Sequence, residues 1–435
     1  MAEPATTAKD SRERRNLGAV IAAVAVSWLT LLLVLWGPAG GEQRPVAEMI
    51  FATTSTPKAT PTPTKTPTRT PTPAATPVPA HVVLLGGNDN NGNLLASAEI
   101  FSPSQNTFSP ITGGVGFGRA STTATLLTSL QVLVAGGMGA GGIPLSSAEV
   151  YVPNVGEFSP TGSLNQARGG HVAVPLLNGM VLVAGGCCVP FNVLDPFWKS
   201  AEIFNPNLHA FSLTKGSMTT ARFGAAGALL ANGKVLIVGG VSDGAEAMPA
   251  TCDIFNPATG KFTATAGPMI SGLLEPTATA LLGNKQVLIA GGIAKVGQTY
   301  AAQAGAQLFD QQSGGFFPVF PMVNARSSHT ATLLRNGRVL IVGGCCDSKG
   351  HALATAEIFN PSIGYFTLTG KLNVPRQEHT ATLLPNGNVL IAGGSNASAA
   401  ALKSAELYNP SSGKFTLLVG KMTTPRAGHA ASPVK

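Results

Sequence analysis

Residues 389–394 read Val-Leu-Ile-Ala-Gly-Gly, and this string or a near copy of it occurs seven times along the chain. A period near 50 residues is typical of a propeller whose blades are four-stranded sheets. The repeat therefore predicts an all-β, seven-bladed propeller over residues 81–435. Such a frame carries unrelated activities, so function has to be argued from individual sites. The seven copies end in the double glycines Gly86-Gly87, Gly136-Gly137, Gly185-Gly186, Gly239-Gly240, Gly291-Gly292, Gly343-Gly344 and Gly393-Gly394.

The residues around the last repeat predict the four strands of one blade. An alternating segment starts at Arg376 and ends before Asn386-Gly387, which is the strongest short hairpin signal. The apolar run 389–392 is the second strand, and its double glycine marks a close backbone approach or a positive φ. Residues 404–408 form the third strand, and a phenylalanine opens the fourth. We expect this phenylalanine to wedge between adjacent blades, and it recurs as Phe108, Phe158, Phe211, Phe262, Phe316, Phe366 and Phe415.

The two ends of the repeat region complete each other. At His81 the chain begins directly with the apolar run that forms the second strand in other blades. The tail, residues 426–435, repeats the start of a first strand with Arg426 and His429, and nothing follows it. We therefore expect residues 426–435 to pair with blade one and close the ring, which removes the open sheet edges that template aggregation.

Four signatures recur in fixed order: R-x-x-H-T-A-T-L-L, the double glycine, S-A-E-[IVL]-[FY]-N-P and G-x-F-[ST]. By these signatures, residues 81–435 resemble the kelch-repeat family, in the tandem form found in bacterial surface proteins and within the galactose oxidase-like propeller superfamily. The resemblance implies a propeller that binds proteins or glycans through loops at one end. Family blades commonly carry tryptophan where this chain has phenylalanine, which changes packing and not topology.

The residues before the repeats predict a membrane anchor. Residues 1–16 are polar, and Leu17–Trp36 is a run of 20 residues without a charge, long enough to cross a bilayer as a helix. Three arginines among residues 12–15 place the first segment in the cytoplasm and the propeller outside, by the positive-inside rule. A cleaved signal peptide cut near residues 37–39 is the alternative, but the long apolar run and the proline at the cut argue against it. We expect a single-pass protein of the cell membrane.

Residues 37–80 form a Thr/Pro-rich linker, in which alternating threonine and proline have no apolar face to bury. Residues 53–80, extended at about 3.1 Å per residue, reach roughly 90 Å. The whole chain carries a net charge of +8, but only 11% of its residues are charged and the repeats contain no basic run. This pattern excludes a nucleic-acid footprint and is typical of an extracytoplasmic, monomeric propeller.

Arginine starts the first strand of six blades, and a carboxylate occupies the third strand of the same six. In the fifth blade Leu274 and Gln307 stand at these places, so both charges are lost together. A buried charge without its partner is costly, and we interpret these residues as structural ion pairs rather than a ring of catalytic carboxylates. The arginines are Arg119, Arg168, Arg222, Arg326, Arg376 and Arg426, and the carboxylates are Glu99, Glu149, Glu202, Asp253, Glu357 and Glu406.

Histidine and cysteine supply the candidate metal ligands. His171, His329, His379 and His429 recur on first strands without a cysteine or carboxylate at ligand spacing. We therefore expect hydrogen-bonded structural histidines, with no metal and no cofactor.

Paired cysteines open the loops after two of the double glycines: Cys187-Cys188 and Cys345-Cys346. Outside the membrane thiols oxidise, so a disulfide between neighbours in each pair is the favoured local outcome. Free or otherwise paired thiols and a zinc ion shared by the two pairs are the alternatives. Cys252, on a third strand, is expected to be a buried thiol.

Departures from the repeat mark the candidate binding residues. The longest loop after a double glycine, residues 187–199, holds the only tryptophan beyond the anchor. Its flat aromatics beside an aspartate and an asparagine resemble a stacking platform for a sugar or peptide, and a self-packed loop is the alternative. Two residues of blade six are expected to face this loop across the channel mouth. The candidate ligand-binding residues are Phe191, Asn192, Asp195, Phe197, Trp198, Asp347 and His351.

These observations favour a membrane-anchored, extracytoplasmic binding or adhesion module that recognises a protein or glycan, and we expect no enzyme. An alternative is a galactose oxidase-like or other carbohydrate-active enzyme on the same frame. Resemblance to galactose oxidase implies copper ligands from tyrosine and histidine and a cysteine-linked tyrosine. The chain has four tyrosines and no adjacent Tyr-His pair, and it lacks the Ser-x-Asp-x-Gly-x-Thr-Trp boxes of sialidases. A structural surface spacer is the third hypothesis.

Overall fold

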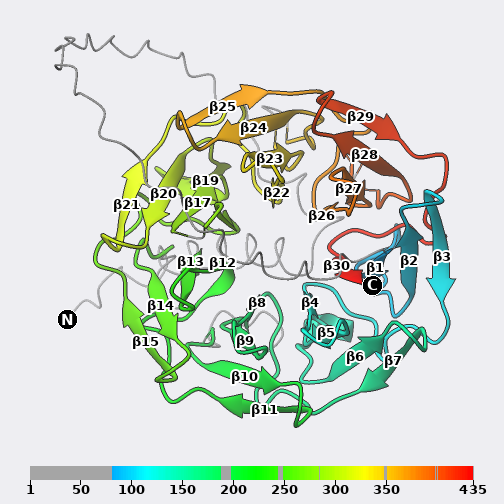
Figure 1. Cartoon of the computed structure of the whole chain (residues 1–435), viewed down its shortest axis with the longest axis horizontal. Helices are drawn as coiled ribbons and strands as arrows, with labels where there is room; N and C mark the ends of the chain where they lie inside the picture. The colour runs from blue at the N-terminus through cyan, green and yellow to red at the C-terminus, as the bar shows by residue number, and fades with distance from the viewer. Residues whose placement is uncertain are drawn as a thin grey trace, which may run out of the picture.

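The computed structural model describes residues 81–187, 197–242, 248–283, 285–346, 350–396, 398 and 400–434. Seven four-stranded antiparallel sheets stand around a central axis, and the innermost strands of neighbouring blades are in contact all the way round (Figure 1). The expectation of an all-β, seven-bladed propeller is confirmed. The apolar segment Leu17–Trp36 and the linker lie outside the described residues. Within those residues, no helix is long and apolar enough to cross a bilayer.

Each blade has four positions, A to D, counted from the axis outward. Blade one contains β30 (Ala430–Val434), β1 (His81–Leu85), β2 (Ala98–Ser102) and β3 (Thr107–Ile111). Blade two contains β4 (Thr123–Leu126), β5 (Val132–Ala135), β6 (Ala148–Val152) and β7 (Glu157–Pro160). Blade three contains β8 (Val172–Pro175), β9 (Val181–Ala184), β10 (Ala201–Asn205) and β11 (Ala210–Leu213). Blade four contains β12 (Phe223–Leu229), β13 (Val235–Val241), β14 (Asp253–Asn256) and β15 (Lys261–Ala264).

The remaining blades follow the same order. Blade five contains β16 (Thr277–Ala280), β17 (Gln286–Ala290), β20 (Ala306–Asp310) and β21 (Gly315–Pro318). Blade six contains β22 (Thr330–Leu333), β23 (Val339–Val342), β24 (Ala356–Asn360) and β25 (Tyr365–Leu368). Blade seven contains β26 (Thr380–Leu383), β27 (Val389–Ala392), β28 (Ala405–Asn409) and β29 (Lys414–Leu417).

The core follows from the position of each strand. Position B carries the apolar run of the repeat, and in β5, β9, β23 and β27 every residue is buried, because sheets of neighbouring blades cover both faces. At the outer edge the recurrent phenylalanine of position D lies against an aromatic ring of position C in its own blade. In blade seven the rings of Tyr408 and Phe415 are 4.8 Å apart. The pair also packs against the preceding blade, as the shared apolar cluster of blades six and seven shows.

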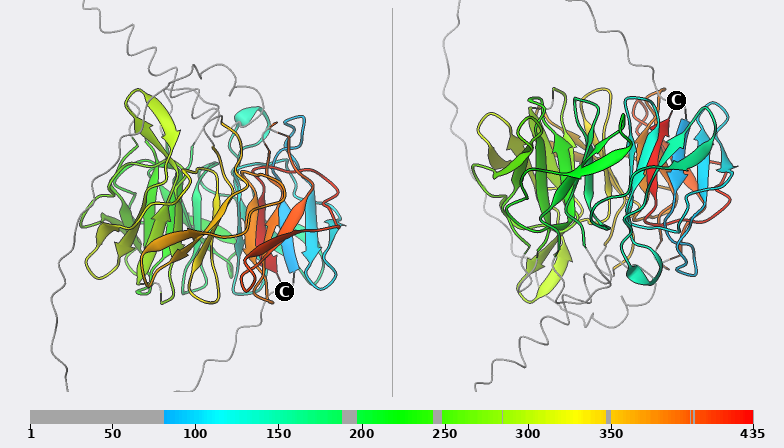
Figure 2. Two further views of the ribbon diagram at one scale, coloured as in Figure 1. Left: turned by 90° about the horizontal axis from the view of Figure 1, so that it is seen from above. Right: turned by 90° about the horizontal axis from the view of Figure 1, so that it is seen from below.

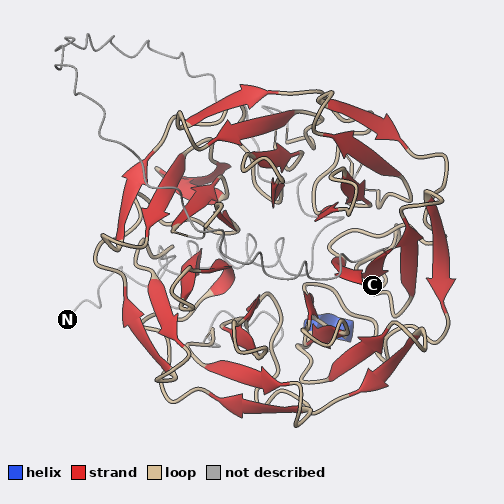
Figure 3. Cartoon of the chain, in the orientation of Figure 1, coloured by secondary structure: helices blue, strands red, loops and turns tan. Residues whose placement is uncertain are grey.

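Two faces of the disc differ in their connections. Strands A and B, and strands C and D, are joined by tight turns at one end, which we call the turn face. The connections from B to C and from D to the next A lie at the other end, which we call the loop face. The hairpin β18 (Ile293–Val296) and β19 (Thr299–Ala302) and the short 3-10 helix η1 (Ala140–Gly142) project from the loop face. Figure 2 shows the C-terminus at the opposite face, and Figure 3 shows strands and loops around the rest of the described ring.

The double glycines join neighbouring blades. In blade seven the N–H of Gly394 donates to the carbonyl of Arg426, which starts the next position A, at 2.9 Å. Gly393 has a φ of +61°, and a Cβ there would lie 2.5 Å from the same carbonyl oxygen. Any side chain would therefore push the blades apart, which explains why the glycine recurs.

The seam of the ring is a strand pair. β30 runs antiparallel to β1, from His81 opposite Val434 to Leu85 opposite Ala430. The last strand thus supplies position A of the blade whose other three strands come first in the chain, and no edge of blade one is left open at the axis.

Candidate functional site

Buried ion pairs hold the loop-face end of six blades. In blade seven Arg376 Nη2 lies 3.0 Å from Glu406 Oε1, and its Nη1 donates to the carbonyl of Gly393 at 2.7 Å. The carboxylate also accepts the backbone N–H groups of Asn373 and Val374. Every member is engaged by its own blade, so these charges are structural. The six pairs are Arg119–Glu149 (2.8 Å), Arg168–Glu202 (2.8 Å), Arg222–Asp253 (2.9 Å), Arg326–Glu357 (2.7 Å), Arg376–Glu406 (3.0 Å) and Arg426–Glu99 (3.0 Å).

Blade five shows what replaces a pair. The carbonyl of Leu273 accepts the N–H of Gly240 at 2.8 Å, as the arginine carbonyls do elsewhere. Leu273 therefore occupies the arginine position, and the sequence-based assignment of Leu274 to it is wrong by one residue. Gln307 Oε1 accepts the N–H of Ile270 at 3.1 Å, the backbone role of the carboxylates in other blades. An amide suffices there because no arginine needs neutralising.

The four recurrent histidines link neighbouring blades near the axis. Each Nε2 lies 2.8–3.1 Å from the threonine Oγ1 that starts position A of the preceding blade. Burial lowers the pKa of His171, His329 and His429 to about 3, and a nearby arginine adds to the effect. The pKa of His379 is held well below its usual value by burial and by Arg376. The rings are neutral at physiological pH and act as hydrogen-bonding groups of the frame. The pairs are Thr123–His171, Thr277–His329, Thr330–His379 and Thr380–His429.

One residue per blade, just before this histidine position, forms a belt around the channel at the loop face. All seven have a positive φ of 49–64°. In five of them the backbone N–H donates to the carbonyl of the belt residue in the preceding blade at 2.9–3.1 Å. Backbone hydrogen bonds therefore connect most neighbouring belt residues. Three blades place glycine here, which suits this left-handed conformation. The belt residues are Ser121, Gly170, Gly224, Glu275, Ser328, Glu378 and Gly428.

Two belt residues are glutamates in the same half of the ring. Glu275 Oε2 accepts a hydrogen bond from Ser328 Oγ at 3.0 Å, and the carbonyl of Ser328 accepts the N–H of Glu378 at 2.9 Å. Burial raises the pKa of Glu275 to about 7 against the lowering effect of Ser328. The pKa of Glu378 is raised well above its usual value, first by burial and then by the charge of Glu275. Burial alone explains the direction at Glu275, whereas at Glu378 burial and a neighbouring like charge outweigh the lowering effect of the Gln377 and Ser395 side chains.

Oxygen atoms without partners surround Glu378. Both of its carboxylate oxygens, Gln377 Oε1 and Ser395 Oγ are buried and lack a hydrogen-bond partner in the described structure. Gln377 and Ser395 pair through their backbones, at 2.9 and 3.0 Å, which fixes both side chains beside the belt. We call Glu275, Ser328, Gln377, Glu378 and Ser395 the belt carboxylate site. Sequence reasoning missed it; the available signal was glutamate at a position that three blades fill with glycine.

Most of the loop residues expected to bind a ligand lie outside the described residues. Phe191, Asn192, Asp195 and Cys188 fall in residues 188–196, and Asp347 falls in residues 347–349; both segments lie outside the described residues. His351 is exposed on the loop face of blade six.

The two aromatic residues of the blade-three loop that are described pack onto the propeller. The ring of Phe197 stacks on that of Phe223 with centroids 5.7 Å apart. The indole N–H of half-buried Trp198 donates to the carbonyl of Ala167 at 3.0 Å. Phe197 joins an apolar cluster with Met138 and other side chains of blades two to five. In this part of the loop the self-packed alternative therefore describes the observed contacts.

The cysteines differ from one another. Cys345 and Cys346 form a disulfide between neighbours, with a cis peptide bond between them. Cys187 is buried in the apolar cluster of the loop face. Cys252 is buried in blade four, and desolvation raises its pKa to about 12, so it is an unreactive thiol.

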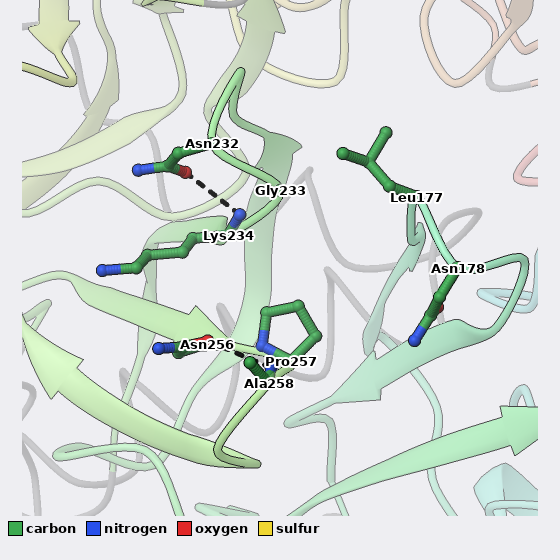
Figure 4. A pocket seen from close by; sticks show the side chains of 8 residues that line it. All are labelled: Leu177, Asn178, Asn232, Gly233, Lys234, Asn256, Pro257 and Ala258. Atoms are coloured by element: carbon green, nitrogen blue, oxygen red, sulfur yellow. Dashed lines mark hydrogen bonds between the residues drawn. The ribbon is translucent and has the colours of Figure 1, made fainter.

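A shallow pocket on the turn face is made by the repeat itself (Figure 4). Asn232 Oδ1 accepts the N–H of Lys234 at 3.1 Å, and Asn256 Oδ1 accepts that of Ala258 at 3.0 Å. These bonds shape the turns, and the same pattern recurs at Asn336. The pocket shows no feature that distinguishes it from other turns.

The donors that a copper oxidase needs do not gather here. Among the described residues, no group of three or more His, Cys, Asp or Glu is placed to hold a metal ion. Tyr408 OH is hydrogen-bonded to Thr369 Oγ1 at 2.9 Å in blade seven, and Tyr365 stacks on Phe320 at 3.9 Å at the outer rim. The residues therefore do not fit a tyrosine–histidine copper site.

Comparison with known proteins supports the fold. No protein-family model and no curated protein matches the sequence. A solved structure of a fungal alcohol oxidase of the AA5 family, in complex with copper, superposes with a TM-score of 0.58 and 17% identity, covering 74% of this chain and 70% of that one. The structure of YjhT superposes with a TM-score of 0.55 and 14% identity, covering 69% of this chain and 97% of that one. The fold is a seven-bladed β-propeller.

This similarity corrects one expectation. We expected no enzyme, whereas a protein with the same fold is an alcohol oxidase that contains copper. The propeller frame therefore gives no ground for excluding catalysis. At these identities the likeness shows the fold alone, and the activity of that oxidase does not carry over.

Proposed function

We propose that this chain is a binding module, anchored in the cell membrane by Leu17–Trp36, that recognises an extracytoplasmic protein or glycan through its loop face. The observation that carries the proposal is that the departures from the repeat gather on that face. Binding residues concentrate on loops held by a rigid scaffold, and a propeller is such a scaffold.

The two faces differ in how far they repeat. On the turn face the same hairpin turn recurs. In each copy the side-chain oxygen of an asparagine accepts a hydrogen bond from the backbone N–H two residues later. On the loop face blade two has η1, blade five has the β18–β19 hairpin, and blade six has the Cys345–Cys346 disulfide followed by exposed His351. An apolar cluster from blades two to five meets the belt carboxylate site of blades five to seven. Both groups are buried beneath the face, so its exposed contacts come from the blade-five hairpin and His351.

The topology also supports the orientation. His81 begins β1, which is at position B, and strands at this position run from the turn face to the loop face. The chain therefore enters the ring at the turn face. An anchor preceding residue 81 would leave the loop face directed away from the membrane, toward partners.

The test uses the full chain in lipid nanodiscs, screened against arrays of glycans and extracted surface proteins. Lys295→Ala on the blade-five hairpin and His351→Ala change the loop face, and Lys261→Ala changes an exposed lysine at the turn face. We expect at least a tenfold loss of affinity, about 1.4 kcal/mol, in one or both loop-face variants and none in Lys261→Ala. Mass spectrometry of the recovered ligand also detects any chemical conversion.

Equal binding by all three variants and the wild type would contradict the proposal, as would a ligand whose binding is weakened only by Lys261→Ala.

A further inference from the structure

The belt carboxylate site has the composition of a cation site. Its side chains present the carboxylates of Glu275 and Glu378, the amide oxygen of Gln377 and the hydroxyl of Ser395. Ser395 is only 2% exposed, and its hydroxyl faces the Glu378 carboxylate, lowering the pKa of that group, without forming a hydrogen bond in the described structure. Buried polar groups in folded proteins are nearly always satisfied, so this cluster calls for a bound species.

We propose that the belt carboxylate site binds a calcium ion between Glu275 and Glu378. The two carboxylates supply two negative charges, which balance a divalent cation in a poorly solvated place. Calcium takes six to eight oxygen ligands with flexible geometry, and carboxylate, amide and hydroxyl oxygens all serve. Magnesium demands a near-ideal octahedron and is less suited to ligands drawn from different blades.

The unpartnered side-chain atoms of Gln377, Glu378 and Ser395 are all oxygens, the type of ligand that calcium takes, although the Nδ1 atoms of the neighbouring His329 and His379 are also buried without a partner. The neighbouring His329 and His379 use their Nε2 atoms in bonds to threonines of adjacent blades. Only two carboxylates take part, so the site needs neutral oxygens as well, and Ser328 and Ser395 stand next to them. The raised pKa values of Glu275 and Glu378 agree with this assignment, because burial disfavours both charged forms and the charge of Glu275 adds to the effect at Glu378.

The inference is independent of the ligand of the loop face. A calcium ion bridging blades five and seven would clamp the belt across blade six, whose Ser328 already bonds both neighbours. It would therefore stabilise the frame whatever partner binds above it.

Calorimetry on the full chain in detergent tests the proposal, after EDTA treatment and dialysis at pH 7.5 in 150 mM salt. Calcium chloride is titrated into wild type, Glu275→Gln, Glu378→Gln and the matched control Glu157→Gln, an exposed carboxylate of β7. We expect one calcium ion per wild-type chain and per Glu157→Gln chain. Affinity should fall at least tenfold in each belt variant, and calcium should raise the melting temperature only where it binds.

Melting in EDTA separates loss of the site from loss of the fold. Both belt variants remove a buried charge, so without calcium they should melt no lower than wild type. Three results would overturn the proposal: no calcium binding by wild type, unchanged affinity in both belt variants, or magnesium binding more tightly than calcium.

Discussion

A charged guanidinium with almost no solvent exposure is the most unusual residue in six of the seven blades. Arg376 contacts a carboxylate, the carbonyl at the end of position B and the carbonyl at the start of position C. It thereby connects strands A, B and C of the blade at one point. Its carboxylate partner binds the backbone of the segment that leads into strand A. Removing one partner of such a pair leaves an uncompensated buried charge, whereas removing both is far less costly. Blade five demonstrates the second case with Leu273 and Gln307.

A double-mutant cycle on blade seven tests this reasoning. Arg376→Leu alone and Glu406→Gln alone should each lower the free energy of unfolding by about 3–5 kcal/mol. The double variant recreates the blade-five pair and should lose much less than the sum of the two, which urea unfolding of the full chain measures. Additive losses would show that the two side chains act separately.

Residue identities predicted part of this arrangement. The joint loss of both charges in blade five indicated pairing, and the structure places each arginine within 3.0 Å of its carboxylate. The position of Leu273 was missed by one residue because two leucines are adjacent and Pro276 replaces the histidine that marks the register elsewhere. The belt glutamates were missed because their meaning depends on a ring of backbone bonds between blades, which no single repeat reveals.

At the level of elements, the seam is the one place where a blade of the described ring is completed by the far end of the chain. Every other blade is continuous in the chain, whereas blade one depends on five residue pairs between β30 and β1. Arg426, just before β30, also pairs with Glu99, and its backbone carbonyl accepts the N–H of Gly394, which follows β27 in blade seven. One short segment therefore completes a sheet, an ion pair and a blade junction.

Deletion of residues 426–435 should abolish the cooperative thermal transition and cause aggregation. Glu99 would then be buried without its arginine, and β1 would expose an unpaired apolar edge. Size-exclusion chromatography and thermal melting of the full chain and the deletion check this. Deletion of Lys435 alone is the control and should change neither. A shortened chain that remains monomeric and melts like the parent would refute the role given to the seam.

For the whole molecule, the threonine–histidine links predict how stability changes with pH. Four histidines have folded-state pKa values lowered far below the ordinary value of 6.5. Between pH 6.5 and about 3 these histidines are protonated in the unfolded chain but remain neutral in the folded protein. The free energy of unfolding therefore falls as the pH falls through this window. Glu275 and Glu378 act in the opposite direction because their pKa values are raised, but they are two groups against four.

Stability should therefore decline from pH 7.5 to pH 5, because the four histidines outweigh the two glutamates. Each histidine contributes about 2 kcal/mol to the decline at pH 5. His429→Gln should make the dependence shallower, whereas replacement of exposed His351 by Gln should not. Urea unfolding at a series of pH values measures both slopes. A flat profile would mean that the rings are solvated or charged in the folded protein.

The period of the repeat was sufficient to predict the blade number, the strand order and the closed ring, because each signature fixes one strand and its neighbours. It was not sufficient for the loop face. Loops after the double glycines differ from blade to blade, so periodicity carries no information about them. Trp198 illustrates this. The composition of its loop suggested a stacking platform for a ligand, but its indole N–H donates a hydrogen bond to the carbonyl of Ala167.

Because His81 lies opposite Val434, the first and last residues of the propeller are neighbours in space. The closed ring of blades therefore has no structural first blade, and the chain could begin and end at another turn of the ring. A circular permutant, with these ends joined and new ends placed in another turn, would have the same contacts and the same shape.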